Sequence, residues 1–137
     1  MFMTVINAEN CVAGRLASIV AKRLLNGEEI TIVNAEKAIV TGNPVSIVGE
    51  FEEKIKRGDP YHGPFYPKAP DRILRRIIRG MLPFHRPRGR DAYRRLKVYK
   101  AIPRELKNEQ AEVIGQTKSK AESKFIYLND VSKKFGG

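Results

Sequence analysis

The sequence is poor in the residues from which metal sites and many catalytic centres are built. It has one cysteine, Cys11, two histidines, His62 and His85, and no tryptophan. A single cysteine can neither close an internal disulfide nor define a metal site, which fits a reducing compartment. No carboxylate stands at a motif spacing from either histidine, and no base is marked for the thiol. We therefore expect no enzyme, no metal and no catalytic residue.

Long apolar runs are also lacking. The longest are a handful of residues, far short of the roughly 20 that span a bilayer. Residues 1–4 have neither the basic nor the apolar region of a secretory signal. Residues 11–15 hold one glycine where a dinucleotide-binding loop needs three. We expect a cytoplasmic protein without membrane segment or cofactor, and a nucleotide-dependent α/β enzyme is the weaker alternative.

What is abundant is positive charge, and it is local. The chain has 26 Lys and Arg against 15 Asp and Glu, a net charge of +11. Residues 54–100 hold 15 of the basic residues and only three acids, a net +12. The whole excess therefore lies in one segment. Such a segment indicates a polyanionic partner, nucleic acid first and an anionic membrane surface last.

The first half of the chain alternates between strand and helix patterns. Short β-branched or apolar runs at 4–6, 30–34 and 38–40 alternate with helical patterns at 14–25 and from Pro44 to Gly58. In the second helix Val45, Val48, Phe51 and Ile55 recur at helical spacing. This order predicts an α/β fold with a parallel sheet covered by helices.

A third helix, predicted from Asp71 to about Leu82, presents the charge. On a helical projection its four arginines occupy an arc of roughly 100°, and its apolar residues lie opposite. The apolar side must be buried, so we expect the arginines on the outside. Four like charges repel one another, and the arginine fork matches phosphate oxygens in pairs. Phosphate is the expected ligand, and a merely solvated helix face is the alternative.

The segments around this helix add further expectations. Residues 86–90 look like a basic loop that follows a phosphate path, or else a mobile surface loop. Asp91 is expected to cap a short helix through Leu96, a strand is expected over 98–102, and an apolar run at 125–128 precedes a last short helix. Tyr61, Phe65 and Tyr66 can stack on unpaired bases or pack against the core. The predicted RNA-binding residues are Arg15, Lys68, Arg72, Arg75, Arg76, Arg79, His85, Arg86, Arg88, Arg90, Arg94, Arg95 and Lys97.

Several blocks of the sequence resemble one family over nearly the whole chain. They are residues 5–8, 13–18 and 33–36, the specific Gly80-Met81-Leu82-Pro83, and residues 94–99. These resemble the L13 family of large-subunit ribosomal proteins in its archaeal and eukaryotic form. Family members tend to carry Gly, Asp or Asn shortly after the position of Tyr99, where this chain has Lys100 and Ala101. The difference affects the turn there.

The resemblance implies a fold, partners and a role. The fold is a single three-layer α/β/α domain over 1–137, with its core in 1–57 and part of 98–137 and a basic, RNA-facing helix-loop extension in 58–97. The role is that of a structural constituent of the large ribosomal subunit, which binds its RNA, supports assembly and contacts neighbouring ribosomal proteins. Met81 and Leu82 are expected to anchor the basic helix, and Pro83 to direct the chain toward RNA.

Overall fold

The computed structural model describes residues 3–56, 67–106, 111–114 and 124–135. The predicted aromatic residues Tyr61, Phe65 and Tyr66 lie outside these ranges, as does Gly58. Along the chain the elements are β1 (Met3–Asn7), α1 (Ala13–Leu25), β2 (Glu29–Val33), η1 (Ala35–Lys37), β3 (Ile39–Thr41), α2 (Pro44–Lys56), α3 (Pro70–Arg79), α4 (Pro87–Arg94), β4 (Leu96–Val98), η2 (Arg104–Leu106), β5 (Phe125–Tyr127) and α5 (Leu128–Lys134).

The main sheet is parallel, in the strand order β1-β2-β4. A parallel bridge between Ile6 and Glu112 adds a contact on the outer side of β1. A second, antiparallel pair joins β3 to β5. The α/β class with a mainly parallel sheet, predicted from the alternating pattern, is confirmed.

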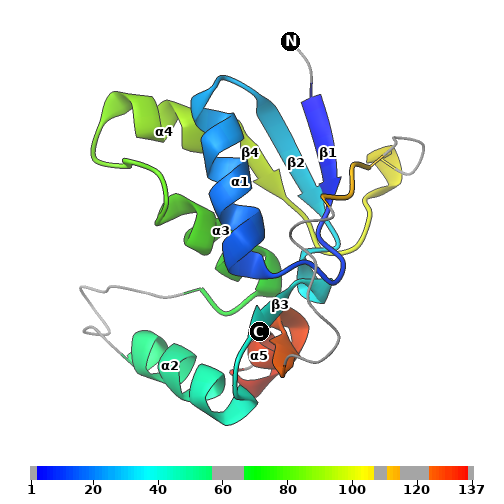
Figure 1. Ribbon diagram of the computed structural model, residues 1–137, viewed down its shortest axis with the longest axis vertical. Helices are drawn as coiled ribbons and strands as arrows, with labels where there is room; N and C mark the ends of the chain where they lie inside the picture. Colours follow the sequence, from blue (N-terminus) through cyan, green and yellow to red (C-terminus); the bar gives the residue numbers. More distant parts are fainter. Residues whose placement is uncertain (1–2, 57–66, 107–110, 115–123, 136–137) are drawn as a thin grey trace.

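The register decides which strand residues enter the core. Ile6, Ile32 and Leu96 share one face of the sheet and are buried there. Helix α1 crosses this face, with α3 and α4 beside it (Figure 1). Val5 and Thr31 point to the opposite face and are also buried. Buried side chains therefore lie on both faces of the sheet.

Helix α2 packs beside the β3–β5 pair and α5, at the lower end of the molecule in Figure 1. Phe51 is buried, whereas Val45, which recurs with it at helical spacing in the sequence, is 81% exposed. The helix begins at Pro44 and rotates Val45 outward in its first turn. Ile47, four residues before Phe51, is buried in its place. Among the described residues, no helix is both long enough and apolar enough to cross a bilayer.

The turn after β4 contains a strained residue where the sequence departs from the family pattern. Ala101 has φ +52°, a left-handed conformation that costs a residue with a Cβ about 1–2 kcal/mol. The Ala101 N–H donates to Glu36 Oε2 at 2.6 Å, and its carbonyl accepts from the Asn34 N–H at 2.9 Å. Asn34 is left-handed as well, with φ +58°. The turn forms without glycine because hydrogen bonds hold it.

Two predicted boundaries in the basic segment are wrong. Residues 87–90 are not a loop but the first turn of α4, and Asp91 lies within that helix instead of capping it. Pro87 supplies the start, since its fixed φ suits the first helical position. The strand expected at 98–102 is Leu96–Val98, because the left-handed Ala101 and the following Pro103 end extended pairing.

Candidate RNA-binding surface

Helix α3 is amphipathic as predicted, and its two sides are separated by burial. Ile73, Leu74 and Ile78 are 0–1% exposed and belong to the core. Arg72 and Arg75 are exposed on the outside, and Arg76 and Arg79 are half-buried. With Pro70 in the first turn and Asp71 near the positive end of the dipole, the helix has favourable residues at its start. The core therefore fixes the arginine side outward.

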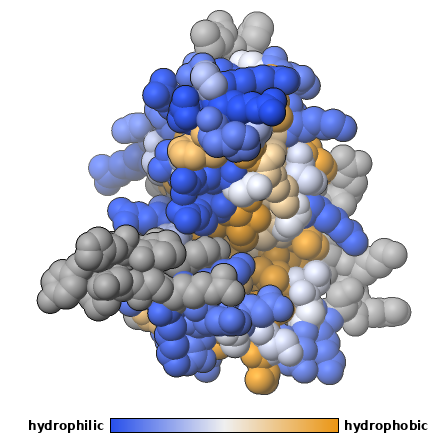
Figure 2. Space-filling view, turned by 90° about the vertical axis from the view of Figure 1, so that its left-hand side faces the viewer, coloured by the Kyte–Doolittle hydropathy of each residue, from blue (hydrophilic) through white to orange (hydrophobic). Residues whose placement is uncertain are grey.

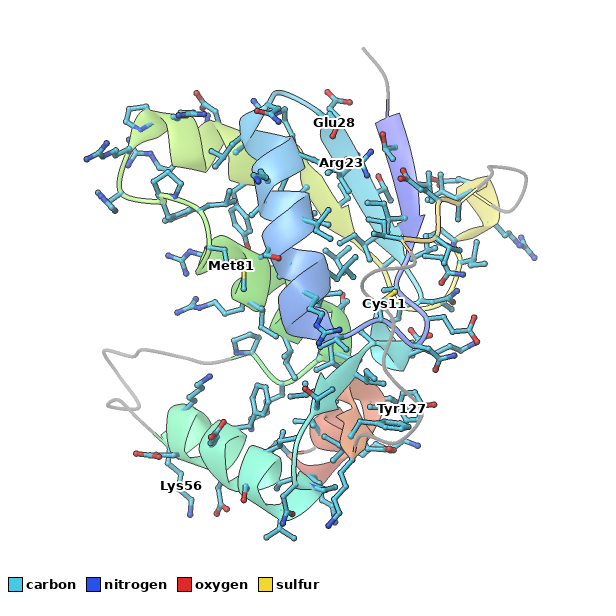
Figure 3. All side chains as sticks on the ribbon, viewed as in Figure 1. Cys11, Arg23, Glu28, Lys56, Met81 and Tyr127 are labelled. Atoms are coloured by element: carbon cyan, nitrogen blue, oxygen red, sulfur yellow. The ribbon has the colours of Figure 1, made fainter. Side chains whose placement is uncertain are left out.

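The anchor of this helix differs in part from the prediction. Leu82 is 6% exposed and packs in the core, as expected. Met81 is 43% exposed, so its predicted anchoring role is wrong (Figure 3). Helix α3 ends at Arg79, and the turn that follows rotates Met81 away from the apolar side.

Two aromatic rings hold two of these arginines. The Arg75 guanidinium carbon lies 4.6 Å from the centroid of Tyr93, and that of Arg79 lies 4.1 Å from the centroid of Phe84. The two rings meet edge to face, with centroids 5.4 Å apart. Tyr93 is in α4 and Phe84 in the preceding turn, so the contacts link α3 to α4. A guanidinium stacked on a ring has fewer orientations to lose when it binds an anion.

Sequence reasoning missed both rings as parts of the site. Phe84 and Tyr93 stand inside the basic segment, and their closeness to arginines in the sequence was a usable signal. What the sequence does not reveal is the pairing, because it depends on how α4 packs against α3.

Helix α4 presents three more exposed arginines, Arg86 at its N-cap and Arg88 and Arg90 in its first turn. The Arg90 Nη1 donates to the carbonyl oxygen of the exposed His85 at 3.3 Å. A Cβ at Gly89 would lie 2.0 Å from the carbonyl oxygen of Pro83. Only glycine lets α4 lie this close to the turn, and this contact positions its arginines.

The three basic residues around the start of β4 have different surroundings. Arg94, Arg95 and Lys97 line one hollow with Glu29 and Thr31. Arg95 is half-buried, and its Nη2 donates to the carbonyl oxygen of Leu24, at the C-terminal end of α1, at 2.6 Å. Arg94 is exposed and pairs with Asp91 at 3.3 Å. Arg95 therefore has a structural contact that the sequence did not indicate.

Not all predicted residues gather on α3 and α4. Lys68 is exposed just before α3, whereas Arg15 is exposed in the first turn of α1. Figure 2 shows the side of the molecule that faces left in Figure 1. Hydrophilic side chains cover its upper part, where Figure 1 places α4, and a band of hydrophobic residues lies beside them.

Arg23 lies outside this surface and is paired with two acidic side chains. Arg23 of α1 and Glu28 lie close together (Figure 3), at 2.7 Å, and Arg23 also lies 3.3 Å from Glu112. The hydrogen bond with Glu28 raises the pKa of Arg23, and burial opposes the shift. In the described part of the chain, residues 67–100 contain only two acids, Asp71 and Asp91. Within this described segment the basic residues therefore far outnumber the acids.

The described residues show neither a metal-ligand cluster nor an exposed thiol. No group of three or more His, Cys, Asp or Glu among them is arranged to hold a metal ion. Cys11 is buried, with its Sγ 3.6 Å from the carbonyl oxygens of Asn7 and Glu9. A thiol enclosed by its own turn has a packing role.

The comparisons with known proteins identify the family of this chain. The sequence model of the family described as Ribosomal protein L13 matches residues 2–105. The Large ribosomal subunit protein uL13 of Methanosarcina barkeri is 52% identical over 137 residues, which cover 98% of each chain. Those of Methanopyrus kandleri and Archaeoglobus fulgidus are 47% and 46% identical and cover 97% of this chain and 86% and 87% of the relatives. The relatives are named as proteins of the large ribosomal subunit, which agrees with the expectation from the sequence of a ribosomal protein and not an enzyme. This chain belongs to the ribosomal protein L13 family.

Proposed function

We propose that this protein is a structural component of the large ribosomal subunit and binds large-subunit ribosomal RNA through the arginines of α3 and α4. The observation that carries the proposal is the pair of stacked arginines, Arg75 on Tyr93 and Arg79 on Phe84. Both arginines lie on α3, whose other side is buried in the core. A rigid cationic surface of this kind suits a folded RNA, whose phosphates have fixed positions.

Phosphate contacts are expected to supply most of the affinity. Each arginine can donate two parallel hydrogen bonds to one phosphate, and the contact releases condensed counterions. Recognition of the correct RNA then depends on the match between the spacing of the arginines and the fold of the RNA. In this proposal the protein supports subunit assembly, contacts neighbouring ribosomal proteins, and resides on cytoplasmic ribosomes.

The test is the salt dependence of binding to protein-free large-subunit ribosomal RNA. Replacing Arg75, Arg76 and Arg79 by Ala is expected to weaken binding and to flatten its logarithmic salt slope by roughly 0.7–0.9 for each phosphate contact removed. The matched control replaces three exposed lysines elsewhere, Lys37, Lys133 and Lys134. The control loses the same charge but is expected to change the slope much less. An unchanged slope in the arginine variant, with its circular dichroism intact, would contradict the proposed surface.

A further inference from the structure

A groove runs along the outer edge of β4, beside the first turns of α3. Asp71, Arg72 and Arg75 line one side, and residues 96–99 line the other. Arg72 and Arg75 are exposed, and Tyr99 is 37% exposed. The groove therefore combines two cations, one carboxylate and one accessible aromatic ring.

The strand edge in this groove has unused hydrogen-bonding groups. The Ile30 N–H donates to the Arg95 carbonyl, and the Tyr99 N–H donates to the Ile32 carbonyl. In a parallel pair these bonds use alternate residues of each strand. The backbone groups of Leu96 and Val98 therefore point away from β2, into the space beside α3. Within the described ranges neither residue has another backbone partner. Such an edge can bind a further hydrogen-bonding group.

Asp71 is the residue that a phosphate groove does not explain. Within the described part of the chain its carboxylate has neither a hydrogen bond nor an ion pair, and Oδ1 is buried without a partner. A carboxylate repels phosphate but has about four lone-pair sites for donors. The ligand expected here therefore carries a negative charge at one end and hydrogen-bond donors at the other. A nucleotide has this polarity.

We propose that the groove binds one unpaired nucleotide of an RNA and that Asp71 selects guanine. Arg72 and Arg75 hold the phosphate, Tyr99 stacks on the base, and the Asp71 side chain turns so that both carboxylate oxygens face the groove and accept from the guanine N1–H and N2–H groups. Guanine is the standard base that offers two adjacent donors on its Watson–Crick edge. Unpaired bases are the parts of RNA that proteins read most often in this way. This inference rests on the proposed function and specifies one contact of it.

An added peptide strand is the competing ligand for a strand edge. The edge of β4 is only three residues long, at the lower limit for a strand. Two arginines at the groove also favour an anion over a neutral backbone. The observations therefore favour the nucleotide.

The test compares short single-stranded RNAs that differ only in one central base within a uridine tract, with fluorescence anisotropy as the readout. The wild-type protein is expected to bind the guanine oligonucleotide about tenfold more tightly than the adenine one, in the range of one bidentate base contact. The inosine oligonucleotide, which keeps N1–H but lacks the 2-amino group, is expected to fall between them. As a second readout, guanosine monophosphate is expected to displace the bound oligonucleotide at a lower concentration than adenosine monophosphate does.

Asp71→Asn is expected to abolish the preference for guanine, because an amide cannot accept both donors. Asp91→Asn removes the same charge from an exposed site on α4 and is expected to keep the preference. Wild-type protein that binds all bases equally would overturn the inference without the use of any variant. So would a folded Asp71→Asn protein that still prefers guanine, or an extended peptide that displaces the oligonucleotide while both monophosphates fail to do so. Arg76 and Arg79 do not line the groove, so ribosomal RNA binding without base preference would refute this site alone and leave the proposed function standing.

Discussion

The guanidinium of Arg79 lies 4.1 Å from the ring centroid of Phe84, across the turn that connects α3 to α4. The contact fixes a charged group of one helix to a residue outside it. Since the same ring packs against Tyr93, which holds Arg75, the two aromatic residues tie the arginines to one another. The arginine surface is thus arranged without a ligand.

Phe84→Leu should weaken RNA binding without changing the number of phosphate contacts. The loss of a cation–π contact worth about 0.5–1 kcal/mol releases Arg79, and we expect affinity to fall roughly two- to fivefold. The salt slope should stay near the wild-type value, since Arg79 remains charged. Phe84→Tyr keeps the ring and should bind normally. A slope as flat as that of the triple arginine variant would show that Phe84 does more than orient one side chain.

Gly89→Ala should unfold or displace α4. The new Cβ would meet the Pro83 carbonyl oxygen at 2.0 Å, so the backbone must move, and we expect a loss of about 3 kcal/mol or more in the free energy of unfolding. The control is Gly49→Ala in α2, where no atom lies within 4 Å of the added Cβ. That change should stabilise the protein by about 0.5–1 kcal/mol. Urea titration of both variants measures the difference, and a mild effect at Gly89 would contradict the close approach.

Arg94 and Arg95 should separate into a surface residue and a structural one. Arg95→Ala removes a charged donor to the Leu24 carbonyl and should cost about 1.5–3 kcal/mol of stability. Arg94→Ala removes only an exposed pair with Asp91 and should change stability by less than about 0.5 kcal/mol. Thermal unfolding without RNA distinguishes the two. Equal melting temperatures would mean that the Arg95 contact does not support the fold.

Ala101→Gly should stabilise the protein. Ala101 has a positive φ that glycine adopts without strain, so the change should add roughly 0.4–1 kcal/mol. Ala38→Gly, at φ −69° in the core, should destabilise the protein instead. Glycine raises the conformational entropy of the unfolded chain there and relieves no backbone strain in the folded protein. Both effects are measured by chemical denaturation. A destabilised Ala101→Gly variant would show that the alanine methyl group makes a contact that outweighs its strain.

Much of the fold could be predicted from local pattern. The amphipathic side of α3, the alternation of strands with helices and the location of the charge are all properties of neighbouring residues. The errors arose where a boundary depended on a distant contact. Residues 87–90 read as a loop from their proline, glycine and arginines, but packing against Pro83 makes them helical. Val45 and Ile47 both fit an apolar helical stripe in the sequence, and the packing of α2 beside β5 and α5 buries Ile47 instead of Val45.

The candidate site, too, depends partly on local sequence pattern and partly on contacts between distant residues. The sequence by itself determined that the excess positive charge belongs to one segment and that four arginines share one side of a helix, because both depend only on residue order and helical periodicity. The tertiary structure decided which arginines stack on rings, which one supports α1, and which lie beside the open edge of β4. Those relationships join residues of different elements, and only packing brings such residues together.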